Sequence, residues 1–245
     1  MQKFLLLIGK RDLLLLKEGK EYNTSFGKVD LKNVKLGDVV ETKKEKFIVA
    51  LPTISDLMRK CRRGAQIVMP KDASQIVAVT GLGRGWRCLD AGSGSGFLAI
   101  FLGNLVGGKG RVYTYEIRKD FYEIARRNIE MCGMERVVRI KNEDVKNFKE
   151  RNLDLITLDM KNAHTMVEKA KKHLKPGGWL AIYSPHIEEQ IRAREEMEKE
   201  GMMIYATMET IQRLWKSRYG YTHPKPSGIL HTGFITIGRK LMDLQ

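Results

Sequence analysis

The hydrophobic and polar positions from about residue 74 onward alternate between short apolar runs and longer amphipathic stretches. The apolar runs predict strands at 86–91, 111–116, 136–144, 153–159, 179–185, 202–209 and 229–239. The amphipathic stretches predict helices at 73–82, 95–106, 120–133, 163–174 and 188–201. Because strands that alternate with helices of about ten or more residues favour parallel pairing, we expect an α/β fold. The sheet should be seven-stranded, mostly parallel, doubly wound and Rossmann-like.

The N-terminal part of the chain has a different pattern of hydrophobic residues. Short apolar runs at 4–8, 12–16, 28–31, 38–42 and 46–51 are separated by turns containing Gly, Lys and Asn, which predicts a small β-sheet or barrel. We therefore divide the chain into a small N-terminal β domain (1–57), a basic linker (58–73) and a larger α/β domain (74–245). The linker carries Arg59, Lys60, Arg62 and Arg63.

The charge balance adds a candidate partner. The 245 residues include 44 Lys and Arg against 29 Asp and Glu, for a formal net charge of +15. Such an excess favours a polyanion such as nucleic acid, because cationic side chains that neutralise phosphates release counterions. The alternative is the charge-rich surface of a thermophilic protein, but such surfaces are usually balanced.

The three cysteines and the apolar runs exclude several protein classes. Cys61, Cys88 and Cys132 are odd in number and form no CxxC pair, so we expect buried thiols rather than a disulfide framework or a metal site. No apolar run approaches the ~20 residues that span a bilayer. The first residues lack the apolar core and cleavage site of a secretion signal. We expect a soluble, cytoplasmic protein with no membrane partner.

A glycine-rich loop follows the first strand of the α/β domain. Gly92, Gly94 and Gly96 stand at alternate positions in "DAGSGSGFL" (90–98), directly before a predicted helix. Open α/β sheets bind ligands at the carboxyl ends of their strands, and glycines let the backbone approach a ligand closely. NAD binding is the rival for the loop alone, although the spacing departs from G-x-G-x-x-G. A tight structural turn is the remaining alternative.

The next strands end in carboxylates. Glu116 stands at the tip of the second strand, where it can accept hydrogen bonds from both ribose hydroxyls of a bound adenosine. Asp144 follows the third strand, where it can accept a hydrogen bond from the adenine amino group. "LKPGGWLAIYSP" precedes and includes the fifth strand. Taken in order, these elements resemble the class I S-adenosylmethionine-dependent methyltransferases. The 74–245 region is then the S-adenosylmethionine-binding catalytic domain.

Several separated stretches resemble one family within that class, the tRNA (adenine-58-N1)-methyltransferases. The two most specific are "RRGAQIVMPKD" (62–72) and "HTGF" (231–234). Others are "LDM" (158–160), "YSPHIEEQ" (183–190), "ETIQRLW" (209–215) and "HPKPSGILHTGF" (223–234). The order and spacing fit over essentially the whole chain.

The resemblance implies a homotetramer that methylates N1 of adenine 58 in the tRNA T-loop, and in some archaeal members adenine 57 also. It implies cofactor contacts from the glycine loop and from the acidic strand ends, namely Gly92, Gly94, Ser95, Gly96, Phe97, Leu98, Glu116, Asp144 and Asp159. Because the sulfonium of S-adenosylmethionine supplies the electrophile, we expect that no metal is needed.

Asp159, at the end of the fourth strand, is the candidate catalytic residue. Methylation at N1 makes the adenine ring cationic, and a carboxylate near the exocyclic amine stabilises or relieves that charge. The alternative is that Asp159 caps the N-terminus of the following helix.

Substrate contacts are expected from Arg63, Gln66, Met69 and His231. The family often has tyrosine where Met69 stands, and methionine packs on a purine without the hydrogen bond of a phenol. It often has Arg-Pro where this chain has His223-Pro, and His223 either contacts phosphate or is a plain surface histidine. His231 and Thr232 either shape the pocket or lie at a subunit interface. An enzyme that reaches adenine 58 must take the base out of its stack.

Two other functions stay open. A protein isoaspartyl methyltransferase shares the fold and a similar loop, but the +15 charge and the 62–72 block speak against a protein substrate. A noncatalytic tRNA-binding subunit is expected to have lost part of its cofactor site, whereas Glu116, Asp144 and Asp159 are all retained.

Overall fold

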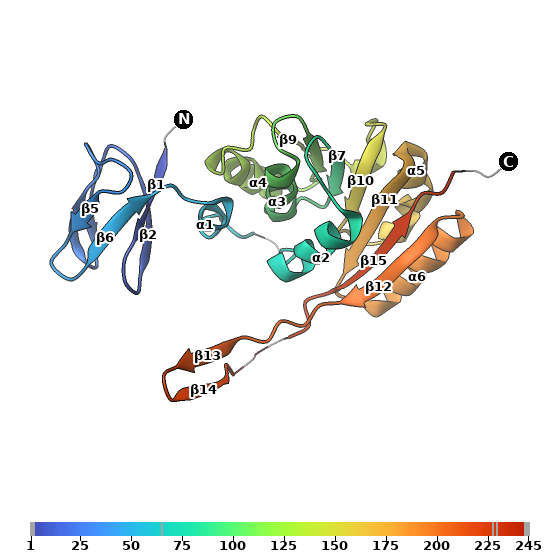
Figure 1. Cartoon of the computed structure of the whole chain (residues 1–245). Coiled ribbons are helices and arrows are strands. Elements are labelled where there is room, and N and C mark those ends of the chain that lie inside the picture. Colours follow the sequence, from blue (N-terminus) through green and yellow to red (C-terminus); the bar gives the residue numbers. More distant parts are fainter. Residues whose placement is uncertain (1–2, 65, 227, 229, 243–245) are drawn as a thin grey trace. The chain divides into compact units, whose positions relative to one another are not determined.

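The structure is a computed structural model that describes residues 3–64, 66–226, 228 and 230–242 (Figure 1). The described chain forms two compact units. One extends to Arg62 and includes Met131–Gly133, and the other contains the remaining residues. Ala65, Ser227 and Ile229, which fall in the 62–72 and 223–234 blocks, lie outside the described residues.

Antiparallel strands build the first unit. The order in its main sheet is β2 (Leu13–Lys17), β1 (Phe4–Ile8), β6 (Lys46–Ala50) and β5 (Val39–Glu41). β3 (Glu21–Thr24) and β4 (Gly27–Asp30) form a separate hairpin. The core of this unit consists of buried side chains from both sheets and the loop after β4: Leu5, Leu7, Val29, Leu31, Phe47 and Val49. The predicted small N-terminal β region is confirmed, although the hydrophobic pattern missed β3, whose polar residues give little apolar signal.

A seven-stranded sheet forms the centre of the second unit. Its strands are β7 (Arg87–Ala91), β8 (Arg111–Tyr115), β9 (Val138–Lys141), β10 (Leu153–Leu158), β11 (Leu174–Ser184), β12 (Met203–Glu209) and β15 (Phe234–Arg239). The order is β12-β15-β11-β10-β7-β8-β9, with β15 antiparallel to both neighbours and the remaining pairs parallel. The predicted mostly parallel, Rossmann-like sheet is confirmed.

Helices alternate with these strands as the amphipathic pattern predicts. They are α3 (Phe97–Val106), α4 (Lys119–Met131), α5 (Val167–His173) and α6 (Ile187–Lys199), with a 3-10 turn at Ala163–Met166 before α5. Val167 and Ala170 of α5 and Ala193 of α6 share one buried cluster with Ile156 of β10 and Leu180 of β11. Packing against these two helices therefore buries one face of the central strands.

Three local features differ from the sequence pattern. α2 (Pro70–Thr80) begins inside the stretch assigned to the linker, because Pro70 fits the first turn of a helix. α1 (Ile54–Met58) lies across the predicted boundary at residue 57. β11 starts at Leu174, so it includes the Lys-Pro-Gly-Gly stretch that reads as a turn.

A projecting hairpin was also missed. β13 (Trp215–Arg218) and β14 (Tyr221–Pro224) pair with each other and with no other described strand, and they extend away from the seven-stranded sheet (Figure 1). Their side chains are mostly exposed, so they lack the alternation of apolar and polar residues by which a half-buried strand is recognised.

No helix among the described residues is long and apolar enough to cross a membrane.

The N-terminal core gives a stability prediction. The Phe47 side chain is fully buried and packs edge-on against Phe26, with ring centroids 5.2 Å apart. Phe47→Ala should lower the free energy of unfolding of this unit by about 3–5 kcal/mol, since it leaves a cavity. Hydrogen exchange of β1 and β6 measures the loss. Val39→Ala, at an exposed position of β5, is the control, and unchanged protection in Phe47→Ala would contradict the assignment of this core.

Candidate active site

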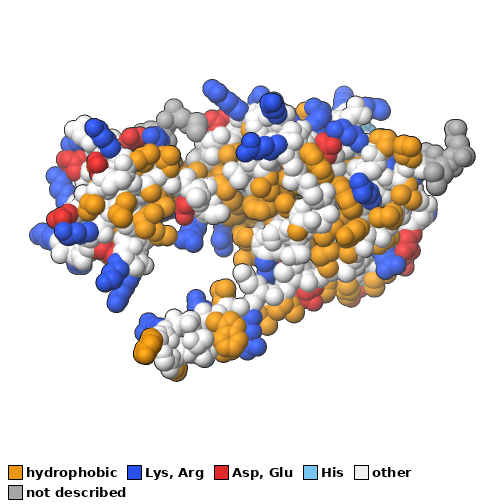
Figure 2. Space-filling model, viewed as in Figure 1, with side chains coloured by type: hydrophobic (Ala, Val, Ile, Leu, Met, Phe, Trp, Pro, Cys, Tyr) orange, Lys and Arg blue, Asp and Glu red, His pale blue; other side chains and the backbone are white. Residues whose placement is uncertain are grey.

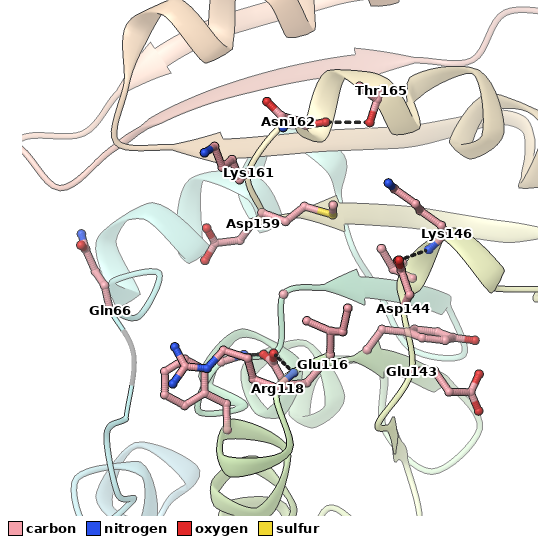
Figure 3. Close-up of a pocket in the computed structure, with 17 residues that line it drawn as sticks. Gln66, Glu116, Arg118, Glu143, Asp144, Lys146, Asp159, Lys161, Asn162 and Thr165 are labelled. Carbon is pink, nitrogen blue, oxygen red and sulfur yellow. Dashed lines mark hydrogen bonds between the residues drawn. The ribbon is translucent and has the colours of Figure 1, made fainter.

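A cavity of about 570 Å³ lies at the carboxyl ends of β7, β8, β9 and β10 (Figure 3). We call it the donor cavity, because the sequence resemblance predicts that a methyl donor binds here. Its wall contains residues that follow each of these strands, namely Gly92, Gly94, Glu116, Arg118, Asp144, Asp159 and Lys161, together with Gln66 from the segment before α2. Three of the carboxylates predicted from separate strand ends are thus brought to one cavity by parallel pairing.

The glycine loop is held between its two neighbouring strands. The Asp159 N–H donates to the carbonyl of Ala91 at 2.9 Å, and the Gly94 N–H donates to Glu116 Oε2 at 2.8 Å. Gly92 has φ +83°, and a Cβ added there would lie 1.9 Å from the Asp159 carbonyl oxygen. No other residue fits at Gly92 without moving the backbone that carries Asp159.

The rest of the loop has a different environment. Ser95, Phe97 and Leu98 line a small adjoining hollow with Gln66 and Asp159. Ser95 Oγ accepts a hydrogen bond from the Gly64 N–H at 2.8 Å, so this loop also holds the segment before α2. None of these three is among the described residues that line the donor cavity.

Gly96 is a packing glycine. A Cβ added at this position would lie 3.2 Å from the Cβ of Ala125 in α4, and its φ is +79°. Gly96 therefore lets α3 begin close to α4, and it borders neither the donor cavity nor the adjoining hollow among the described residues.

Glu116 and Asp144, the two carboxylates predicted to face an adenosine, are both in the cavity wall. Glu116 is buried, and its Oε1 accepts from the Arg118 N–H at 2.9 Å while Oε2 accepts from Gly94. Asp144 precedes the 3-10 turn Val145–Asn147 and accepts from the Lys146 N–H at 2.8 Å. Backbone donors therefore fix both carboxylates at the edge of the cavity.

Asp159 lies where the cavities meet. It borders the donor cavity, the small hollow and a third cavity of about 400 Å³. We call this third cavity the acceptor cavity, because the sequence predicts that a methyl acceptor lies beside Asp159. Tyr183, Ser184, Pro185 and His186, at and after the end of β11, line the acceptor cavity. Asn162, rather than Asp159, precedes the 3-10 turn of residues 163–166, so the helix-cap interpretation of Asp159 is not supported.

Burial shifts the titration of Asp159. Removal from water, together with the charge of the nearby Asp90, raises the pKa of Asp159 to about 7. Asp90 is itself buried, and this raises its pKa to about 6 even though Thr114 and Thr157 donate hydrogen bonds to it at 2.7 and 2.8 Å. Asp159 is therefore a carboxyl that changes charge near neutral pH.

The predicted substrate residues are not equally close to the cavities. Gln66 lines the donor cavity and the small hollow, and Figure 3 shows the Asp159 carboxylate pointing to the side on which Gln66 lies. The Arg63 guanidinium lies 5.6 Å from the Phe97 ring centroid. Met69 precedes α2.

His231 is engaged elsewhere. Its Nδ1 lies 2.9 Å from Glu209 Oε1 and its Nε2 lies 3.1 Å from the carbonyl of Pro185. Hydrogen bonding to Glu209 raises the pKa of His231. Arg63, Met69 and His231 are not among the described residues that line the donor or acceptor cavity.

Sequence reasoning missed Tyr183 as a site residue. It is the penultimate residue of β11 and opens the "YSPHIEEQ" block. Its place near the end of a strand at this edge of the sheet was the available signal.

Comparison with known proteins gives the family. The model of the tRNA methyltransferase complex GCD14 subunit family matches residues 50–227. The chain is 32% identical to the tRNA (adenine(57)-N(1)/adenine(58)-N(1))-methyltransferase TrmI of Methanocaldococcus jannaschii, over 94% of this chain and 92% of that protein. It is 32% identical to the tRNA (adenine(58)-N(1))-methyltransferase TrmI of Thermus thermophilus, over 95% and 93%. The chain belongs to this tRNA methyltransferase family.

Solved structures agree on the fold of this tRNA methyltransferase. A SAM-dependent O-methyltransferase from Thermotoga maritima superposes with a TM-score of 0.84 at 25% identity, covering 100% of this chain and 95% of that one. The tRNA (m1A58) methyltransferase TrmI from Aquifex aeolicus gives 0.79 at 23% identity, covering 98% of each. By contrast, the protein-L-isoaspartate O-methyltransferase of Methanothrix thermoacetophila matches 49% of this chain, at 30% identity.

The glycine loop of this methyltransferase gives the second prediction. Gly92→Ala should weaken binding of S-adenosylmethionine at least about tenfold, because the new methyl group collides with the backbone at Asp159. Isothermal titration calorimetry measures the dissociation constant. Gly85→Ala is the matched control, since Gly85 has φ +85° with nothing within 4 Å of an added Cβ. Equal losses in the two variants would show that backbone strain, rather than the collision, weakens binding.

Proposed function

We propose that this protein transfers a methyl group from S-adenosylmethionine to N1 of adenine 58 in the T-loop of tRNA. The observation that carries the proposal is the position of Asp159, a carboxylate shared by a donor cavity behind a glycine loop and an acceptor cavity beside Tyr183. Membership of the tRNA methyltransferase family supports the choice of substrate.

The residues of the donor cavity fit the proposed methyl donor. A volume of about 570 Å³ is in the usual range for a cofactor site, and Glu116 and Asp144 supply acceptors for ribose hydroxyls and an adenine amino group. Gly92 lets the backbone come close to a ligand that lies next to Asp159. When bound, S-adenosylmethionine would supply the activated methyl group, so the protein itself needs only to position the acceptor and balance charge.

Asp159 carries the chemistry on the acceptor side. N1 of neutral adenine has a lone pair, and its methylation leaves a positive charge shared with the exocyclic nitrogen. The charged form of Asp159 accepts a hydrogen bond from that amino group and stabilises the developing cation, in a site where burial strengthens the interaction. This role needs a carboxylate and no separate nucleophile.

The surface charge fits a tRNA substrate. The net charge is +15, and the view in Figure 2 shows more Lys and Arg side chains than acidic ones on the surface. Phosphate neutralisation by such side chains gives affinity that falls with salt. The homotetramer and the cytoplasmic location stay predictions, as do the tRNA contacts of Arg63, Met69 and His231.

Methyl transfer to defined transcripts tests the function. The wild type should form N1-methyladenosine in unmodified tRNA, and the product should vanish when adenine 58 is replaced. Asp159→Asn should lower kcat by about 100-fold or more, because the amide cannot balance the positive charge. Nucleoside mass spectrometry measures the product, and a transcript lacking adenine 57 reports on that position.

Glu198→Gln is the control, since Glu198 is an exposed carboxylate on α6 that pairs only with Arg194 among the described residues. If the wild type binds S-adenosylmethionine and tRNA without methylating the tRNA, the protein is instead a subunit that needs a catalytic partner.

The titration of Asp159 gives a pH prediction. Its pKa is raised to about 7, so it is mostly neutral below that pH and charged above it. Because the charged form is the active one, kcat/KM for tRNA should rise between about pH 6 and pH 8 and then level off. Initial rates at limiting tRNA and constant ionic strength measure this. The residual activity of Asp159→Asn should lack the rise, and a flat wild-type profile would contradict the assigned role.

A further inference from the structure

A buried ion pair begins α2, away from the cavity walls. The Asp72 side chain is fully buried and Lys71 is 10% exposed, with Lys71 Nζ 2.7 Å from Asp72 Oδ1. Lys71 Nζ also donates to Thr232 Oγ1 at 2.7 Å and to the carbonyl of Thr210. Thr232 Oγ1 in turn donates to Asp72 Oδ2 at 2.6 Å. Lys71, Asp72 and Thr232 therefore form a closed triangle of hydrogen bonds.

Such a cluster is an unusual way to hold a helix to a loop. Burying a lysine and an aspartate costs solvation free energy that their attraction offsets only when the geometry is good and the remaining donors and acceptors are satisfied. Packed apolar side chains could hold α2 against the 231–234 segment equally well. A charged triangle differs from apolar packing in being directional, because each hydrogen bond constrains the Thr232 hydroxyl in distance and angle.

The Thr232 backbone in turn holds the wall of the acceptor cavity. Its carbonyl accepts a hydrogen bond from the Tyr183 hydroxyl at 2.6 Å and from Gln66 Nε2 at 3.4 Å. The next residue, Gly233, lies against the Tyr183 ring, since a Cβ there would come within 2.4 Å of it. Tyr183 shares the acceptor cavity with Asp159, and Gln66 lines the donor cavity.

We propose that Lys71, Asp72 and Thr232 are positioning residues for methyl transfer, which set the Tyr183 side chain in the acceptor cavity and the Gln66 amide in the donor cavity, the two cavities that Asp159 borders. The proposal rests on the proposed function. The three residues act through the Thr232 carbonyl and do not touch the reacting atoms. A misplaced Tyr183 ring leaves the donor cavity intact but lets the acceptor base sit away from Asp159, which lowers kcat while donor affinity stays the same.

Replacement of Thr232 separates this role from a general one in stability. Thr232→Val keeps the shape of the side chain and removes the hydroxyl that hydrogen-bonds to both Lys71 and Asp72, so kcat for tRNA should fall about tenfold. The dissociation constant for S-adenosylmethionine should change by less than about twofold, because the walls of the donor cavity other than Gln66 are unaffected. Thr232→Ser restores the hydroxyl and should recover most of the lost rate.

Thr207→Val is the matched control. Thr207 Oγ1 shares a hydrogen bond with Thr236 Oγ1 at 3.0 Å between β12 and β15, so this variant loses a comparable hydroxyl within the sheet. Its kcat should stay at the wild-type value. Tyr183→Phe removes the hydrogen bond from the Tyr183 hydroxyl to the Thr232 carbonyl. Because both substitutions break the same connection, the combined Thr232→Val/Tyr183→Phe variant should lose less rate than the product of the two single losses.

The outcomes are distinct. A wild type that binds both ligands but does not methylate tRNA contradicts the proposed function itself. With an active wild type, the positioning role is supported by a kcat loss in Thr232→Val, its rescue by serine and unchanged donor affinity. It is overturned if Thr232→Val has wild-type kcat, if serine fails to rescue, or if donor affinity and melting temperature fall together with kcat.

Discussion

The close contact between Gly92 and the backbone of Asp159 is the constraint on which the site depends. β7 and β10 are parallel neighbours that end at the same level of the sheet, and the Asp159 N–H bonds to the last carbonyl of β7. The loop that would face the donor and the carboxylate that would face the acceptor are therefore parts of one tightly packed edge. Their separation is fixed by sheet geometry, and only glycine leaves the necessary space.

Electrostatics sets the chemical character of that edge. The chain is strongly cationic overall, yet its centre holds the carboxylates Asp90, Glu116 and Asp159. A cationic surface suits a polyanionic substrate, whereas an anionic centre suits a sulfonium donor and an adenine that becomes cationic. Repulsion between Asp90 and Asp159 adds to burial in holding the pKa of Asp159 near neutrality, so a positive charge beside Asp159 is stabilised by this arrangement.

The acceptor wall is built from distant parts of the chain. α2 brings Lys71 and Asp72, β11 brings Tyr183, and the segment before β15 brings Thr232. The blocks 62–72 and 231–234, on which the family resemblance was mainly based, meet at this triangle of hydrogen bonds. The proposed positioning of Tyr183 would need both blocks, because one supplies Lys71 and Asp72 and the other supplies Thr232.

The sequence by itself determined the parts that local pattern encodes. Alternating apolar runs and amphipathic stretches predicted the seven-stranded sheet and its helices, and the rule that ligands bind at strand ends placed Glu116, Asp144 and Asp159 at one edge. It missed β3 and the β13–β14 hairpin, whose polar or exposed residues carry no burial pattern, and it placed the start of α2 three residues late.

Only the tertiary structure decided how individual side chains are used. It separated Gly96, which packs on Ala125, from Gly92, which lines the cavity, although both are glycines of one loop. It directed His231 to Glu209 and brought Tyr183 to the acceptor cavity. The physical reason is that strand ends follow from periodicity along the chain, whereas hydrogen bonds between residues about 160 positions apart, such as Asp72 and Thr232, follow from packing alone.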